Sequence, residues 1–108
     1  MTPYAVLLAH PEINDDAAVR RRFHALVVAE GVHPDSSGVE GVASQRWFEL
    51  NAAYKAVKSR AARDTWLRRQ LLLSRLCPGC AGLGVLLHRG VAAVCPECKG
   101  EGRTAKGL

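Results

Sequence analysis

The chain has 108 residues, enough for one modest hydrophobic core and a small appendage. Its formal charge of +5, from 15 basic and 10 acidic side chains, suits an acidic protein partner or nucleic acid and does not decide between them. No apolar run approaches the ~20 residues that cross a bilayer, and residues 1–8 lack the basic flank and cleavage site of a signal peptide. We therefore expect a cytoplasmic protein without a membrane partner.

Helices are predicted along the chain before the first cysteine. Residues 4–9 form a short apolar segment of one or two helical turns, because a helix stops shortly before a proline such as Pro11. A longer helix is expected from about residue 16 to residue 30, begun by the capping cluster at residues 14–16 and ended by Gly31. Its apolar residues recur at three- and four-residue steps, which predicts one packed face: Val19, Phe23, Leu26 and Val27.

The composition of residues 32–44, which begin with Val32-His33-Pro34-Asp35, predicts a loop. A second long helix is predicted from about residue 44, and a third helical stretch over residues 60–76. Their apolar stripes are Trp47, Leu50, Tyr54 and Val57 in the former and Trp66, Leu67, Leu71 and Leu76 in the latter. The arginines of the last stretch are expected to be exposed: Arg60, Arg63, Arg68, Arg69 and Arg75.

The most specific feature is a repeated pattern, C-P-x-C-x-G-x-G, at residues 77–84 and 95–102. Its four cysteines, Cys77, Cys80, Cys95 and Cys98, form a complete ligand set for one tetrahedral zinc ion. Because protein sulfurs would fill every coordination position, we expect a structural zinc site without a metal-activated water. The residues between the two copies predict a hairpin, with strands at 85–87 and 91–94 and a turn at Arg89-Gly90.

Two other interpretations of the cysteines remain open. A CxxC pair serves as a redox dithiol in some folds, and such thiols would suit a thiol-dependent chaperone. Two disulfides are a further possibility, although they are typical of secreted proteins. The duplication of the pattern together with its glycines favours zinc.

Residues 3–67 resemble a J-domain, the helical module of DnaJ-type co-chaperones. The segment Tyr4-Ala5-Val6-Leu7 is similar to the family's opening Tyr-x-Val-Leu, and residues 19–23, with Arg20, Arg21 and Arg22, resemble the basic stretch of its second helix. The tripeptide His33-Pro34-Asp35 is the family's signature, and residues 48–54 resemble Phe-x-x-Ile-Asn-Glu-Ala-Tyr. The cysteine pattern resembles the repeated unit of the DnaJ cysteine-rich region, which has four units and two zinc ions where this chain has two units and room for one.

The resemblance implies a function and a set of contact residues. A J-domain docks its basic second helix and its His-Pro-Asp loop onto a DnaK-type chaperone ATPase and accelerates ATP hydrolysis by that partner. Under this interpretation Arg20, Arg21 and Arg22 attract an acidic surface of the partner, while His33, Pro34 and Asp35 trigger it. The zinc module would then bind an unfolded client or another target, and the chain itself would not be an enzyme.

We therefore predict a mainly α fold, with a J-domain-like helical hairpin and flanking helices in residues 1–76. A small zinc-binding β-hairpin module is expected in residues 77–104, followed by a tail at residues 105–108. Because no linker separates the two parts, the module is expected to dock partly on the helices, with Leu71, Leu72, Leu73 and Leu76 as candidate contacts. The alternative function is a zinc-containing adaptor on a J-like scaffold, which binds nucleic acid or protein through its zinc hairpin and its arginine-rich last helix.

Overall fold

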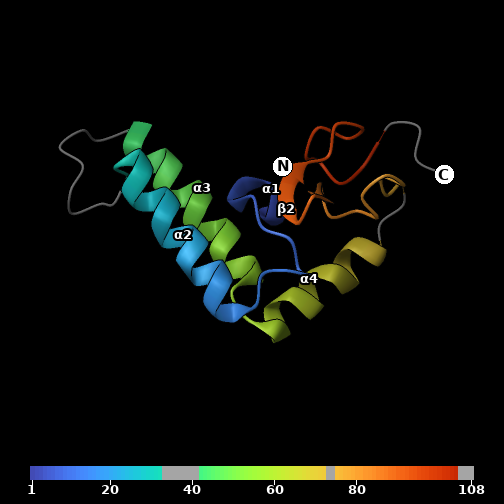
Figure 1. Cartoon of the computed structure of the whole chain (residues 1–108), viewed down its shortest axis with the longest axis horizontal. Coiled ribbons are helices and arrows are strands. Elements are labelled where there is room, and N and C mark those ends of the chain that lie inside the picture. The colour runs from blue at the N-terminus through green and yellow to red at the C-terminus, as the bar shows by residue number, and fades with distance from the viewer. Residues whose placement is uncertain (33–41, 73–74, 105–108) are drawn as a thin grey trace.

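The computed structural model describes residues 1–32, 42–72 and 75–104. Helices α1 (Pro3–Leu7), α2 (Asp16–Glu30), α3 (Val42–Val57) and α4 (Arg60–Leu71) precede strands β1 (Val85–His88) and β2 (Val91–Val94). Figure 1 shows α2 and α3 side by side as one arm of a V and α4 as the other, with α1 and the strands between them. The predicted mainly α class with a small C-terminal sheet is thus confirmed.

Local capping signals set the ends of the helices. Asp15 accepts a hydrogen bond from the Ala18 N–H at 2.8 Å and begins α2, and Gly31, with φ of 61°, ends it in the left-handed conformation. Ser59 begins α4 in the same way, through the N–H of Ala62 at 3.1 Å. The bounds predicted for α2 are confirmed because both of its ends carry such a signal.

The core lies where α1 packs against α3 and α2. Leu7 of α1 and Leu50 of α3 have no exposed surface, and the aromatic rings of Phe23 and Tyr54 stack with centroids 4.5 Å apart. The predicted apolar stripes of α2 and α3 face this core, with Trp47 and Tyr54 only partly buried. Val85 of β1 is also fully buried in the same cluster, so the hairpin contributes to the helical core.

Helix α4 ends earlier than expected, at Leu71 rather than residue 76. Leu76 instead pairs with Arg103 in an isolated antiparallel bridge, which requires the chain to leave the helix beforehand. Leu71 and Leu72 are 64% and 87% exposed, so the prediction that they contact the cysteine module is wrong. Gln70 of α4 faces the module, whereas the next two positions along a helix are rotated from it by about 100° and 200° and so point away. Leu73 lies outside the described residues.

Arg63 also departs from the prediction that the arginines of α4 are all exposed. Its guanidinium donates to Asp16 at 2.7 Å and to the Val57 carbonyl at 3.1 Å, and its side chain is 14% exposed. These contacts tie the start of α4 to the start of α2 and the end of α3. The sequence placed Arg63 among solvated charges because helical periodicity does not reveal a partner on another helix.

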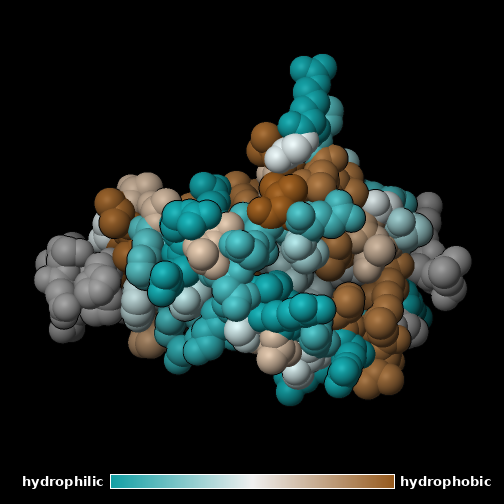
Figure 2. Space-filling view, turned by 60° about the horizontal axis from the view of Figure 1, so that its bottom comes forward, coloured by the Kyte–Doolittle hydropathy of each residue, from teal (hydrophilic) through white to brown (hydrophobic). Residues whose placement is uncertain are grey.

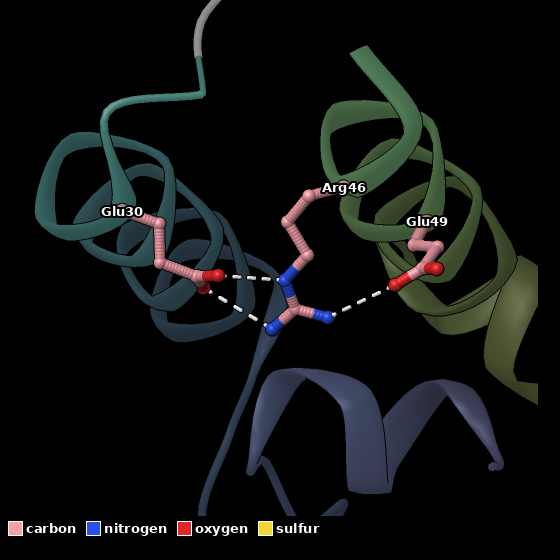
Figure 3. Close-up of polar contacts among 3 residues, drawn as sticks. All are labelled: Glu30, Arg46 and Glu49. Carbon is pink, nitrogen blue, oxygen red and sulfur yellow. Dashed lines mark hydrogen bonds and ion pairs between the residues drawn. The ribbon is translucent and has the colours of Figure 1, made fainter. Parts of the chain in front are cut away.

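A charged cluster joins α2 to α3 near the opposite end of this helix pair. Arg46 donates to both carboxylate oxygens of Glu30, at 2.7 and 3.1 Å, and to Glu49 at 3.2 Å (Figure 3). The hydrogen bond from Arg46 to Glu30 is the main reason why the pKa of this guanidinium is raised. Glu30 precedes residues 33–41 and Arg46 follows them, so the cluster holds the end of α2 against the first turns of α3.

Candidate metal centre

The two copies of the cysteine pattern adopt the same backbone conformation. Each CxxC turn is followed by two residues with positive φ, at 55° and 85° in the first copy and at 55° and 84° in the second. The last glycine of each copy, Gly84 or Gly102, again has positive φ, at 77° or 75°. A repeated sequence therefore produces two equivalent turns, each of which presents two sulfurs.

The four sulfurs converge on one point. All lie within 4.8 Å of one another, with Cys77 and Cys95 3.9 Å apart and Cys80 and Cys98 3.6 Å apart. A tetrahedral ion with metal–sulfur bonds of about 2.3 Å places its sulfurs ~3.8 Å apart. The spacing also far exceeds the ~2.05 Å of a disulfide, and all four cysteines are free thiols. This buried cluster of four cysteines could hold one metal ion.

Backbone N–H groups of the pattern's glycines donate hydrogen bonds to two of the sulfurs. Gly84 donates to the sulfur of Cys80 at 3.2 Å, and Gly102 donates to that of Cys98 at 3.3 Å. A Cβ on Gly102 would lie 2.6 Å from the Gly82 carbonyl oxygen, which is too close for any other residue. The second glycine of each copy is therefore required both by its conformation and by the space around it.

When no metal is bound, burial opposes ionisation of three of the thiols, and for two of them it raises the pKa overall. It raises the pKa of Cys80 to about 12 and also raises the pKa of Cys77. Burial acts in the same direction on Cys98, but the N–H of Gly102 and the neighbouring Cys80 lower the pKa of Cys98 overall. Because a metal ligand must be a thiolate, a bound cation would supply the charge that stabilises all four sulfurs in their ionised form.

The hairpin between the two turns matches the prediction closely. Strands β1 and β2 are antiparallel with Val85 opposite Val94 and His88 opposite Val91. Arg89 and Gly90 both have positive φ, at 52° and 78°, as a two-residue hairpin turn with the twist of its strands requires. His88 is exposed at this turn and lies outside the group of four sulfur ligands.

The start of the chain holds the cysteine module against the helices. Thr2 donates its backbone N–H to the Gly100 carbonyl at 2.8 Å and its hydroxyl to the Leu83 carbonyl at 2.6 Å. The same hydroxyl accepts from Ala5 at 3.1 Å and thereby caps α1. On the other side, Gln70 of α4 donates to the Gly82 carbonyl at 2.8 Å. Sequence reasoning missed both Thr2 and Gln70.

The other predicted functional residues are three arginines of α2 and the tripeptide at residues 33–35. Arg20 and Arg21 are exposed on α2, whereas Arg22 is half-buried and donates to the Leu7 carbonyl at 2.9 Å. Arg22 therefore takes part in packing α1 against α2. The tripeptide at residues 33–35 lies outside the described residues.

Comparison with known proteins finds no relative of this chain. No family model matches the chain, and no curated protein or solved structure is significantly similar to it. Among the residues that the structure describes, none of the helices is long and apolar enough to cross a membrane. Inference about function therefore depends on the motifs and on the geometry of the chain itself.

Proposed function

We propose that this chain is a J-domain co-chaperone that binds a DnaK-type chaperone ATPase and stimulates its ATP hydrolysis. The observation that carries the proposal is the position of the His-Pro-Asp tripeptide in the short connection between α2 and α3, immediately after a helix with exposed basic residues. The tripeptide begins three residues after Glu30, the last residue of α2. Arg20 and Arg21 of the same helix are exposed to solvent. A basic helix face of this kind attracts an acidic surface and speeds the encounter with it.

The Arg46 cluster supports the same proposal. It connects the end of α2 to the first turns of α3 through Glu30, on either side of the connecting segment. The ion pair thereby helps to hold the end of α2 next to the first turns of α3, on the two sides of the tripeptide in the sequence.

The metal in this proposal is zinc, with a structural role. Four sulfurs in tetrahedral spacing suit zinc or iron, and zinc is the usual occupant of paired CxxC turns that carry flanking glycines. With four protein ligands the ion has no open position for a substrate, so the chain itself is not an enzyme in this proposal. The module that it stabilises would bind an unfolded client or another protein target.

The test is steady-state ATP hydrolysis by a DnaK-type chaperone, with and without the zinc-loaded protein. We expect stimulation by the parent and none by His33→Gln, with unchanged helical circular dichroism. The double variant Arg20→Glu/Arg21→Glu should need a higher concentration to stimulate, because it repels an acidic partner surface. Arg68→Glu/Arg69→Glu, the same double charge reversal at exposed positions of α4, serves as the control and should behave as the parent does. No stimulation by the folded, zinc-loaded parent would refute the proposal.

A further inference from the structure

Helix α4 carries an apolar stripe on its outer side. Leu67 and Leu71 lie one helical turn apart and are 40% and 64% exposed. Hydrophobic residues gather in this part of the molecule, on the right of Figure 2. Leu67 also forms one wall of a groove of 260 Å³, whose lining consists of Tyr4, Pro11, Arg60, Arg63, Asp64, Leu67 and Leu83. We call Leu67, Leu71 and this groove the α4 surface.

The α4 surface is bordered by positive charge. Arg60 lines the groove and Arg68 follows Leu67 on the helix, and neither forms an ion pair within the described part of the chain. Arg63 is neutralised by Asp16, and Asp64 is the only acidic residue of α4. The helix therefore presents exposed leucines next to two cations that have no ion-pair partner among the residues that the structure describes.

We propose that the α4 surface binds an acidic segment of another protein that carries at least two large apolar side chains. One apolar side chain would enter the groove beside Leu67 and the next would cover Leu71, while carboxylates would face Arg60 and Arg68. The distance from Arg60 to Leu71 is eleven residues of helix, roughly 16 Å at 1.5 Å per residue. A segment of three helical turns spans this length. The inference goes beyond the co-chaperone proposal and does not depend on it, since it uses a different helix.

The charges and the shape favour this occupant over three others. A second copy of the chain would bring Arg60 and Arg68 against cations of the same kind, which costs free energy. Nucleic acid would contact the arginines but would leave Leu67 and Leu71 without an apolar partner. A membrane surface would meet the leucines and the arginines, but the groove between Pro11 and Leu83 suits an inserted side chain better than a flat layer of headgroups.

The probe is a labelled peptide of about twelve residues, ~18 Å long as a helix, with two leucines four residues apart among Glu and Ala. Two matched peptides replace its glutamates with lysine or its leucines with alanine. Binding is followed by NMR shifts of the amides of the zinc-loaded protein. We expect binding of the acidic leucine peptide with a Kd of roughly 100 μM or below, shifts confined to α4 and residues near Leu83, and at least tenfold weaker binding of both matched peptides.

Variants of the protein test the same contacts. Leu67→Ala/Leu71→Ala should raise the Kd roughly tenfold or more, and because alanine favours helix it should leave the fold intact. Phe48→Ala is the matched control, since Phe48 is 65% exposed on α3, and it should bind the peptide as the parent does. Arg60→Gln/Arg68→Gln should weaken binding and reduce its dependence on salt.

Four results would overturn the inference. They are no binding at ~1 mM peptide, equal binding of the lysine peptide, shifts that map away from α4, or equal binding by the double leucine variant. Other occupants are tested alongside with anionic vesicles, a single-stranded oligonucleotide and sedimentation of the protein alone. If the parent binds no peptide but binds vesicles or the oligonucleotide, or forms a dimer, the α4 variants are tested in the same assay. Loss of that interaction in the variants would assign the surface to the membrane, the nucleic acid or the second copy, respectively.

Discussion

Replacement of Thr2 by valine tests how the cysteine module is attached to the helices. Thr2 is 5% exposed, and its hydroxyl both donates to the Leu83 carbonyl and accepts from the N–H of Ala5. Valine has nearly the same shape and lacks both hydrogen-bonding capacities. The variant Thr2→Val therefore removes the two hydrogen bonds of this side chain, while it preserves the backbone hydrogen bond to Gly100 and most of the packing around the residue.

The expected loss follows from the two hydrogen bonds. An N-terminal cap is worth about 1 kcal/mol, and a carbonyl left without its donor in a partly buried site costs about 1–2 kcal/mol. We expect Thr2→Val to lower the free energy of unfolding by about 2–3 kcal/mol, which corresponds to roughly 10–20 °C in Tm for a protein of this size. Thr2→Ser keeps both hydrogen bonds and loses one methyl group, so it should cost about 1 kcal/mol or less.

The assay is denaturant unfolding at a fixed excess of zinc, because metal binding itself contributes to stability. Thr65→Val is the matched control: the Thr65 hydroxyl is exposed and donates to the Ala61 carbonyl within the same helix at 3.0 Å. It should change the free energy of unfolding by about 0.5 kcal/mol at most. The reasoning is refuted if Thr2→Val stays within about 0.5 kcal/mol of the parent, or if Thr2→Ser costs as much as Thr2→Val.

Two further predictions concern the metal centre and the charged cluster between α2 and α3. Burial raises the pKa of the Cys77 and Cys80 thiols, so both are protonated at neutral pH without metal, and metal binding must release protons. Zinc affinity should therefore fall as the pH falls. Calorimetry in two buffers of different ionisation enthalpy measures the proton release. An enthalpy of zinc binding that is the same in both buffers would contradict the prediction. Arg46→Gln should lower the free energy of unfolding by only about 1 kcal/mol in denaturant unfolding, because the ion pairs of Arg46 are partly exposed. A loss above about 3 kcal/mol would show that the cluster holds α2 to α3 more tightly than its exposure implies.

The parts of the fold that could be predicted from sequence are those with a local signal. The bounds of α2 follow from Asp15 and Gly31, which lie at its two ends and act on adjacent backbone groups. The four-cysteine cluster follows from the spacing of the two CxxC pairs, and the hairpin from Arg89-Gly90 between two short apolar runs. In each case the interacting groups are close in sequence or belong to a repeated pattern.

The parts that could not be predicted depend on contacts between distant residues. Thr2 and Leu83 are 81 positions apart, and nothing near either residue indicates the other. His10, just after α1, is only 8% exposed, and its Nδ1 accepts from the Glu12 N–H at 3.1 Å. Its burial lowers its pKa, an effect that Glu12 opposes. The early end of α4 likewise depends on the pairing of Leu76 with residue 103, on the far side of the hairpin.

The glycines of the cysteine pattern connect these local and distant effects. Gly84 donates its N–H to a sulfur, and a Cβ at the same residue would lie 2.5 Å from the Thr2 hydroxyl oxygen. The residue that supports the metal site therefore also leaves room for the cap of α1. Val85, which follows it, is fully buried in the helical core. Although the sequence divides naturally before Cys77, the packing does not: free energy gained by binding a metal also stabilises the contacts that hold α1 in place.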